Sequence, residues 1–360
     1  MSSINLELFK KLVELPGVSG HEFLISEFIQ NYCKRLSDEV YVDRLGNVAA
    51  VFKGSSAQPR KIMFTSHIDE VGLVVRRIDS NGYIRVVRVG GVDSRAFISR
   101  EVRIVTKTGK EINGIVGIKS HHLMMTPEER DKVPSWNEIY IDVGASDARE
   151  VRDMGVDVGD QITYYPNLRV LNNKLISTKT IDNRALNYIL LKTMEAVSRE
   201  KLHNTIIFAF TVQEELNLKG SIPLARALKP DYIVNLDIVP ATDTPDTLQE
   251  ASEVKLGHGP TLYMYTFHGR GSLAGHVAHL TLRDFIEKIA KDHSIKLQKA
   301  AMLGVVTEVS YLYLQDGIPS IDIGLPCRYT HYPNELASIS DILELENLVQ
   351  LIAMESGKLE

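Results

Sequence analysis

Hydrophobic and polar positions near the start of the chain first follow a helical period and then a strand period. Apolar residues recur at helical spacing in INLELFKKLVEL and HEFLISEFIQNYCKRL, and PGVSG separates the two stretches. EVYVD and NVAAVF are typical of strands on either side of the turn RLGN, and KIMFTSH is typical of a buried strand. The first 70 residues therefore predict two helices followed by three strands.

The interval 71–165 has a different pattern. It contains six short β-rich runs: VGLVVRRI, GYIRVVRV, EVRIVT, INGIVGI, EIYIDVG and DQITYY. Turns such as DSNG and KTGK separate these runs, and only short helix candidates near PEERDKV and DAREVRDM accompany them. Short strands joined by tight turns favour a small barrel or sandwich.

Helices and strands alternate from residue 176 onwards. We predict helices over about 183–199, near SIPLARAL, over 274–291, near 308–315 and in ILELENLVQLIAM, with strands NTIIFAFTV, DYIVNLDIV, TLYMYT, IKLQKAAM and PSIDIGL between them. Asp341 and Glu344 fit a capping box at the start of the last helix. The alternation predicts an α/β fold, a three-layer, mostly parallel sheet with helices on both faces. Residues 1–70 and 166–360 would form this domain, and 71–165 a β-rich, barrel-like insertion.

Composition narrows the classes of function. The 360 residues are 44% hydrophobic and 24% charged, as in an ordinary globular protein. A balance of 41 basic against 46 acidic residues, without a basic stripe, argues against nucleic acid as a partner. No window approaches the ~18 apolar residues of a membrane span, and the N-terminus lacks the apolar core of a signal peptide. Cys33 and Cys327 are too few for a disulfide framework or a thiolate metal site, so we expect a cytoplasmic protein.

Residues that can bind metal gather where the predicted strands end. Five segments carry them: His67 with Asp69, Asp182, Glu214 with Glu215, Asp237, and His331. Because ligands bind beyond the carboxyl ends of strands in open α/β sheets, these residues are expected to meet at one rim. Each alone has a simpler explanation, since a lone His is most often structural and Asp182 could cap a helix. The adjacent pair Glu214 and Glu215 is harder to explain, because burial raises the cost of each charge.

Together these residues supply two imidazoles and five carboxylates, enough for two imidazole and three carboxylate ligands with two carboxylates left over. This is the inventory of a two-metal hydrolytic centre, in which the metals lie about 3.5–4 Å apart and a carboxylate bridges them. Zinc accepts nitrogen and oxygen ligands of this kind, and cobalt or manganese also fits the mixture. We therefore expect two divalent metal ions per chain, with zinc as the first choice.

The order of these motifs resembles that of the tetrahedral aminopeptidases, the family of glutamyl and deblocking aminopeptidases among the co-catalytic metallo-exopeptidases. The matching segments are HIDEVG, TIDNRAL, VQEELNLKGS, DIVPATDTP and RYTHYPNE. The β-rich insertion lies between the first and the second of them, as it does in that family. The resemblance covers essentially the whole chain.

The resemblance implies two metal ions, one bound by His67 and Asp237 and the other by Glu215 and His331, with Asp182 as the bridge. Asp69 would accept the other ring N–H of His67 and orient it. Glu214 would be the general base that takes a proton from a metal-activated water and passes it to the leaving amine. The implied activity is the removal of N-terminal residues from peptides with a free N-terminus. The insertion resembles the dimerisation domain of the family, which implies a homo-oligomer built from dimers, up to a tetrahedral dodecamer.

Two positions depart from the family pattern. Asn217 stands where the family usually has glycine after the two glutamates, and the family stretch GGTDA is replaced by VVTEVS, with Glu308 in place of the aspartate. Neither position is an implied ligand. The shape of the substrate pocket therefore does not follow from the resemblance, and the side-chain preference of the family does not carry over.

Three other functions fit these residues less well. A related two-metal amidohydrolase or deacylase would act on N-acylated amino acids, and the β-only insertion argues against it, because the insert in those relatives is an α/β lid. A non-catalytic scaffold is expected to have lost a ligand or the base, and this chain has all six. A glucanase needs two carboxylates flanking the glycosidic bond, which the adjacent Glu214 and Glu215 do not provide.

Overall fold

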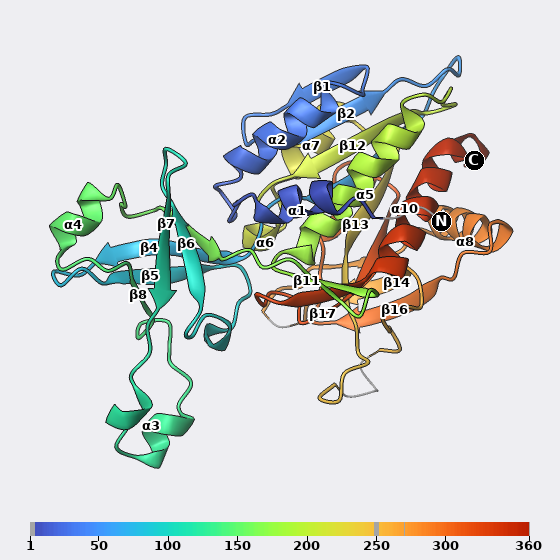
Figure 1. The fold of residues 1–360 in the computed structure, drawn as a ribbon. Helices are drawn as coiled ribbons and strands as arrows, with labels where there is room; N and C mark the ends of the chain where they lie inside the picture. Colours follow the sequence, from blue (N-terminus) through green and yellow to red (C-terminus); the bar gives the residue numbers. More distant parts are fainter. Residues whose placement is uncertain (1–3, 248–251, 270, 360) are drawn as a thin grey trace.

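The computed structural model describes residues 4–247, 252–269 and 271–359, which form a large α/β part and a smaller barrel beside it (Figure 1). The described helices are α1 Leu6–Glu14, α2 Phe23–Cys33, α3 Pro127–Asp131, α4 Ala148–Asp153, α5 Ile181–Val197, α6 Glu214–Asn217, α7 Ile222–Leu228, α8 Leu280–Asp292, α9 Val309–Leu312 and α10 Ile339–Met354. None of these helices is long and apolar enough to cross a membrane.

Twelve strands of the described chain form one sheet. They are β1 Glu39–Val42, β2 Val48–Phe52, β3 Lys61–His67, β10 Arg169–Leu171, β11 Leu175–Thr178, β12 Thr205–Thr211, β13 Tyr232–Pro240, β14 Thr261–Phe267, β15 Gly275–Val277, β16 Gln298–Leu303, β17 Ser320–Arg328 and β18 Glu335–Ser338. The order is β1-β2-β12-β3-β13-β17-β18-β11-β10, and β14 pairs with β15, β16 and β17. The central strands β12, β3, β13 and β17 are parallel, so their carboxyl ends lie at one edge of the sheet.

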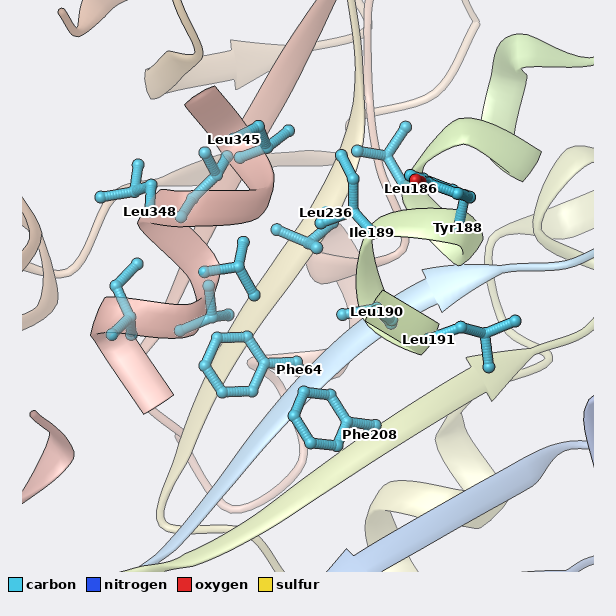
Figure 2. Packing of buried hydrophobic residues seen from close by; sticks show 14 of the residues in the cluster. Phe64, Leu186, Tyr188, Ile189, Leu190, Leu191, Phe208, Leu236, Leu345 and Leu348 are labelled. Atoms are coloured by element: carbon cyan, nitrogen blue, oxygen red, sulfur yellow. The ribbon is translucent and has the colours of Figure 1, made fainter. Parts of the chain in front are cut away.

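Helices cover both faces of this sheet because alternate strand residues point to opposite sides. Phe64 and Phe208 stack with ring centroids 5.5 Å apart in a core that includes α1, α2, α5, α8 and α10. Figure 2 shows residues of α5 and α10 packed around these two rings. The neighbouring residues Met63 and Ile207 instead pack with α7 and α9 in a second cluster. The predicted α/β fold with helices on both faces is confirmed. The four central strands are parallel as expected, but the outer strands β1, β2, β10, β11 and β18 pair antiparallel, so the sheet is mixed instead of mostly parallel.

The inserted region forms a closed barrel with its own apolar core. Its strands are β4 Gly72–Ile78, β5 Ile84–Val89, β6 Glu101–Val105, β7 Glu111–Val116, β8 Tyr140–Asp142 and β9 Gln161–Tyr164, in the order β4-β5-β8-β7-β6-β9. Inside it the rings of Phe97 and Tyr164 stack at 4.3 Å. The segment between β7 and β8, which carries α3, projects away from the rest of the molecule (Figure 1). All six strands lie inside the predicted interval 71–165, although the domain boundaries themselves stay a prediction.

The predicted helix over 274–291 is partly wrong. Residues 275–277 form β15, which pairs with β14, and the helix begins only at Leu280. Gly275 makes this pairing possible, because a Cβ there would lie 2.6 Å from the carbonyl oxygen of Thr266. A close backbone approach therefore overrides the local helical pattern.

The predicted capping box at the last helix is also wrong. α10 begins at Ile339, which places Asp341 inside the first turn. Its carboxylate accepts the N–H groups of Gly257 at 2.7 Å and Gly259 at 2.9 Å. The Asp341 carboxylate, which the local sequence pattern predicted to cap the helix, therefore binds a turn that is distant in the sequence.

Candidate metal centre

The parallel strands bring three of the predicted segments to the same edge of the sheet. His67 is the last residue of β3 and pairs in register with Thr211, the last residue of β12. Glu214 and Glu215 follow three and four residues later, at the start of α6. Asp237 lies in the neighbouring parallel strand β13, within the last four residues of that strand. The strand register therefore explains why these side chains meet.

The remaining two predicted ligands come from irregular segments. Asp182 lies in the first turn of α5, with φ −77° and ψ 98°, which is not helical. His331 follows the end of β17 and has φ 64°. Thr180 and Gln213, close to other predicted ligands, have φ of 62° and 58°. Non-glycine residues seldom adopt this left-handed region, and such strain clusters at functional sites.

Asp182 lies between the two histidines. Its Oδ1 is 3.1 Å from Nε2 of His67, and its Oδ2 is 3.3 Å from Nε2 of His331. Nε2 of His331 is also 3.2 Å from Oε1 of Glu215, and Nε2 of His67 is 3.9 Å from Oδ1 of Asp237. The five predicted ligands thus form two overlapping groups that share Asp182, and the donor atoms within each group lie within 4.8 Å of one another.

Asp69 and Glu214 border these groups. Nδ1 of His67 is 3.4 Å from Oδ1 of Asp69 and 3.3 Å from its carbonyl oxygen, so Asp69 faces the ring. The same carboxylate accepts the backbone N–H groups of Glu214 and Glu215, both at 3.0 Å, and the hydroxyl of Ser19 at 2.5 Å. Glu214 is buried and forms a third close group with His67 and Glu215. Asp69 therefore fixes both the histidine and the turn that carries the two glutamates.

Negative charge dominates the site. In the part of the chain that the structure describes, only the two histidines lie within ion-pair distance of these carboxylates, and no Lys or Arg does. Burial, together with nearby carboxylates, raises the pKa of Glu214 and of Asp237 well above the usual range. Burial opposes the ionisation of Asp182, but its contacts with the two imidazoles outweigh this and lower its pKa.

This donor set fits divalent cations. Imidazole nitrogens and carboxylate oxygens are ligands that zinc accepts. Oε1 of Glu215 is buried, and the imidazole of His331 at 3.2 Å is its ion-pair neighbour among the described residues. A cation would provide the counter-charge that the carboxylates lack.

Comparison with known proteins identifies the family. The model for M42 glutamyl aminopeptidase matches residues 46–348, an interval that includes all of the predicted site residues. This chain belongs to the M42 glutamyl aminopeptidase family. A lysyl aminopeptidase of Pyrococcus furiosus is 31% identical over 97% of this chain and 95% of that protein. The aminopeptidase APDkam598 from the archaeon Desulfurococcus kamchatkensis superposes with a TM-score of 0.91 at 31% identity, covering 97% of this chain and 94% of that one.

A second solved structure agrees with this assignment. The TET1 peptidase of Pyrococcus horikoshii, which can assemble into a tetrahedron or a large octahedral shell, superposes with a TM-score of 0.85 at 29% identity, covering 97% of this chain and 99% of that one. The chain is therefore an aminopeptidase, and the resemblance deduced from its motifs is confirmed. The deacylase and scaffold alternatives are not favoured.

Two contacts of the candidate site were not predicted from the sequence. Nδ1 of His331 donates to the carbonyl oxygen of Gly91, a residue of the inserted region, at 2.8 Å. The carboxylate of Glu22 accepts the N–H of Gln213 at 3.1 Å and so braces the turn before Glu214. Glu22 follows the helix break PGVSG by two residues, and nothing local in the sequence marks it as a partner of Gln213. The Gly91 contact uses a backbone carbonyl and leaves no signal in the sequence.

The two departures from the family pattern differ in position. Asn217 is exposed at the end of α6, where its Oδ1 accepts the N–H of Lys219. Glu308 is 1% exposed, and neither of its carboxylate oxygens has a hydrogen-bond partner among the described atoms, although the hydroxyls of Ser221 and Thr65 lie near it. Burial raises the pKa of Glu308, which favours its neutral form. Thr65 precedes His67 by two residues, so Glu308 lies beneath the site, inside the protein.

Proposed function

We propose that this aminopeptidase is metal-dependent and binds two divalent cations. The observation that carries the proposal is the position of Asp182, which directs one carboxylate oxygen to His67 and the other to His331. His67 and Asp237 would hold one cation, Glu215 and His331 the other, and Asp182 would bridge them. Zinc is the expected metal, and cobalt or manganese suits the same nitrogen and oxygen donors.

The two cations would lower the pKa of a bound water and polarise the scissile carbonyl. The chain's own residues carry out the proton transfer. Glu214 would accept the proton of the attacking water and donate it to the leaving amine nitrogen as the peptide bond breaks. Asp69 holds the Glu214 backbone and the His67 ring in place for this step. The buried position of Glu214 keeps its carboxylate away from bulk water.

The proposed substrates are peptides with a free N-terminus. Cys33 and Cys327 are both free, which supports the reducing cytoplasm as the compartment where the enzyme meets them. We expect elemental analysis to find two metal ions per chain, chelation to abolish turnover, and zinc or cobalt to restore it. Leucyl, lysyl and glutamyl chromogenic substrates would be cleaved, whereas N-acetylated amino acids would not. Full activity in protein stripped of metal would refute the proposal.

A homo-oligomer built on the inserted barrel is the second part of the proposal. The segment that projects between β7 and β8 exposes Leu123, Met125 and Val133, whose exposed fractions are 62%, 80% and 49%. Apolar side chains gathered on an exposed segment are typical of an interface. The assembly of the TET1 peptidase into closed shells supports a dimer-based oligomer, up to a tetrahedral dodecamer. Light scattering that gives the mass of a monomer would overturn this assignment.

A further inference from the structure

Glu335 is a buried carboxylate that binds the backbone of two predicted metal ligands. At the start of β18, its Oε1 accepts the N–H of His331 at 2.7 Å, and its Oε2 accepts the N–H of Asp182 at 2.9 Å. Glu335 is 2% exposed, and no Lys or Arg of the described chain lies within ion-pair distance of it. Its carboxylate therefore faces two N–H groups, both from residues that we expect to bind a cation.

Regular secondary structure holds neither of these two ligands. Asp182 has non-helical dihedral angles within α5, and His331 lies beyond the end of β17 with a positive φ. Buried N–H groups at such positions need a partner that no helix or strand supplies. Glu335 provides that partner for both residues, and so it fixes the points from which their side chains start.

We propose that Glu335 is a positioning residue for the cation bound by Glu215 and His331. This inference rests on the proposed two-cation function. Asp69 acts in the same way on Glu215, whose N–H donates to Oδ2 of Asp69 at 3.0 Å. All three residues of the group that contains His331 are thus held by backbone bonds to a buried carboxylate. The other group consists of His67, Asp182 and Asp237, and of these three described residues only Asp182 donates its backbone N–H to Glu335.

The change Glu335→Gln tests this role with little change of shape. Glutamine keeps one acceptor oxygen and replaces the other with an amide that donates, so one of the two N–H groups loses its acceptor. Residues that orient metal ligands typically contribute about 10–100-fold to metal affinity. We expect the cation at the His331 group to bind about tenfold or more weakly, and the other cation to change by less than about threefold.

Glu335→Asp separates geometry from charge. Aspartate keeps the negative charge, but its shorter side chain does not reach both N–H groups. A positioning role predicts a loss of affinity similar to that of Glu335→Gln. A purely electrostatic role predicts that aspartate restores the wild-type affinity.

Asp341→Asn is a matched control. Asp341 is also a fully buried carboxylate that accepts two backbone N–H groups, from Gly257 at 2.7 Å and Gly259 at 2.9 Å. Neither of these glycines belongs to a segment that carries a predicted ligand. The two variants therefore remove similar interactions, but only Glu335→Gln disturbs the metal centre.

The experiment uses the full chain, stripped of metal and titrated with cobalt(II) by calorimetry and visible absorption. His331→Ala identifies which of the two dissociation constants belongs to its group. We expect Glu335→Gln and Glu335→Asp to raise that constant about tenfold or more, and Asp341→Asn to leave both constants unchanged. The inference fails if Glu335→Gln stays within about twofold of wild type, or if Asp341→Asn shows the same loss. Wild-type protein that binds no cobalt would instead refute the proposed function, and this inference with it.

Discussion

Lys179→Met is expected to destabilise the protein strongly, because Lys179 is the buried counter-ion of Glu70. Its Nζ donates to Oε1 of Glu70 at 2.8 Å, to Oε2 at 2.6 Å and to Oγ1 of Thr163 at 2.9 Å. Lys179 is fully buried, and Glu70 is 2% exposed. Burial opposes the ionisation of Glu70, but Lys179 and Arg184 outweigh it and lower the pKa of Glu70. Burial lowers the pKa of Lys179 to about 8, so both members of the pair are charged at pH 7.

The size of the effect follows from what Lys179→Met leaves behind. Methionine retains much of the apolar stem of lysine, so the main loss is the positive charge. Removal of one partner from a buried ion pair typically costs about 3–5 kcal/mol, because the other charge stays buried without compensation. Arg184 is also fully buried and attracts the Glu70 carboxylate, which moderates the loss. We therefore expect a decrease of about 3 kcal/mol in the free energy of unfolding.

The double variant Lys179→Met with Glu70→Gln is the control for this reasoning. It removes both charges, while the glutamine oxygen can still accept the N–H of Gly17, which bonds to Glu70 at 3.0 Å. The double variant is expected to recover about 2 kcal/mol relative to Lys179→Met, since no uncompensated charge remains. Urea unfolding followed by far-UV circular dichroism, at one protein concentration, measures both values. Equal losses in the single and double variants would refute the explanation by a stranded charge.

Three further changes test other parts of the molecule. Glu214→Gln is expected to lower kcat about 10²–10⁴-fold with both metals retained, and a wild-type kcat with full metal content would exclude Glu214 as the base. Met125→Asp should reduce the mass of the oligomer measured by light scattering, whereas Asp131→Asn on the same segment should not. An unchanged oligomer mass for Met125→Asp contradicts the proposed interface. Burial and the charge of Asp69 raise the pKa of Glu22 from 4.5 to about 7. Between these pH values the folded state binds more protons than the unfolded state, so the free energy of unfolding falls as pH rises, by up to about 3 kcal/mol. Glu22→Gln should remove this fall when the free energy of unfolding is measured by urea unfolding at several pH values. If the pH dependence is the same in Glu22→Gln as in wild type, Glu22 ionises normally.

The structure brings the predicted site residues close together because their positions follow from chain geometry. His67, Glu214, Glu215 and Asp237 lie at or near the ends of strongly apolar strands, and parallel strands place such ends at one edge. The roles of these residues in metal binding stay a prediction. The apolar runs also located the central strands closely, since a strand buried on both faces is a continuous hydrophobic run.

Interactions between distant segments were much harder to predict. The short strands β10, β11 and β18 are stabilised by pairing with one another and with β17, and their sequences carry no clear local pattern. Asp341 matched a local capping pattern, yet it binds a turn about 80 residues earlier in the chain. Glu335 stood in a recognised motif, but its function depends on backbone N–H groups, which every residue type except proline possesses. Side-chain identity predicts chemistry, whereas such backbone contacts emerge only from the fold.

The inserted barrel contacts residues of the candidate metal centre. The carbonyl oxygen of Gly91 accepts the Nδ1–H of His331, and the Tyr164 hydroxyl donates to the His331 carbonyl oxygen at 3.4 Å. Thr163 accepts a bond from Lys179, which lies three residues before Asp182. Chain order explains this coupling, since the insertion starts soon after His67 and ends shortly before the strands that lead to Asp182. Because the same barrel carries the exposed segment proposed as the interface, contacts between subunits would act on the residues that orient His331.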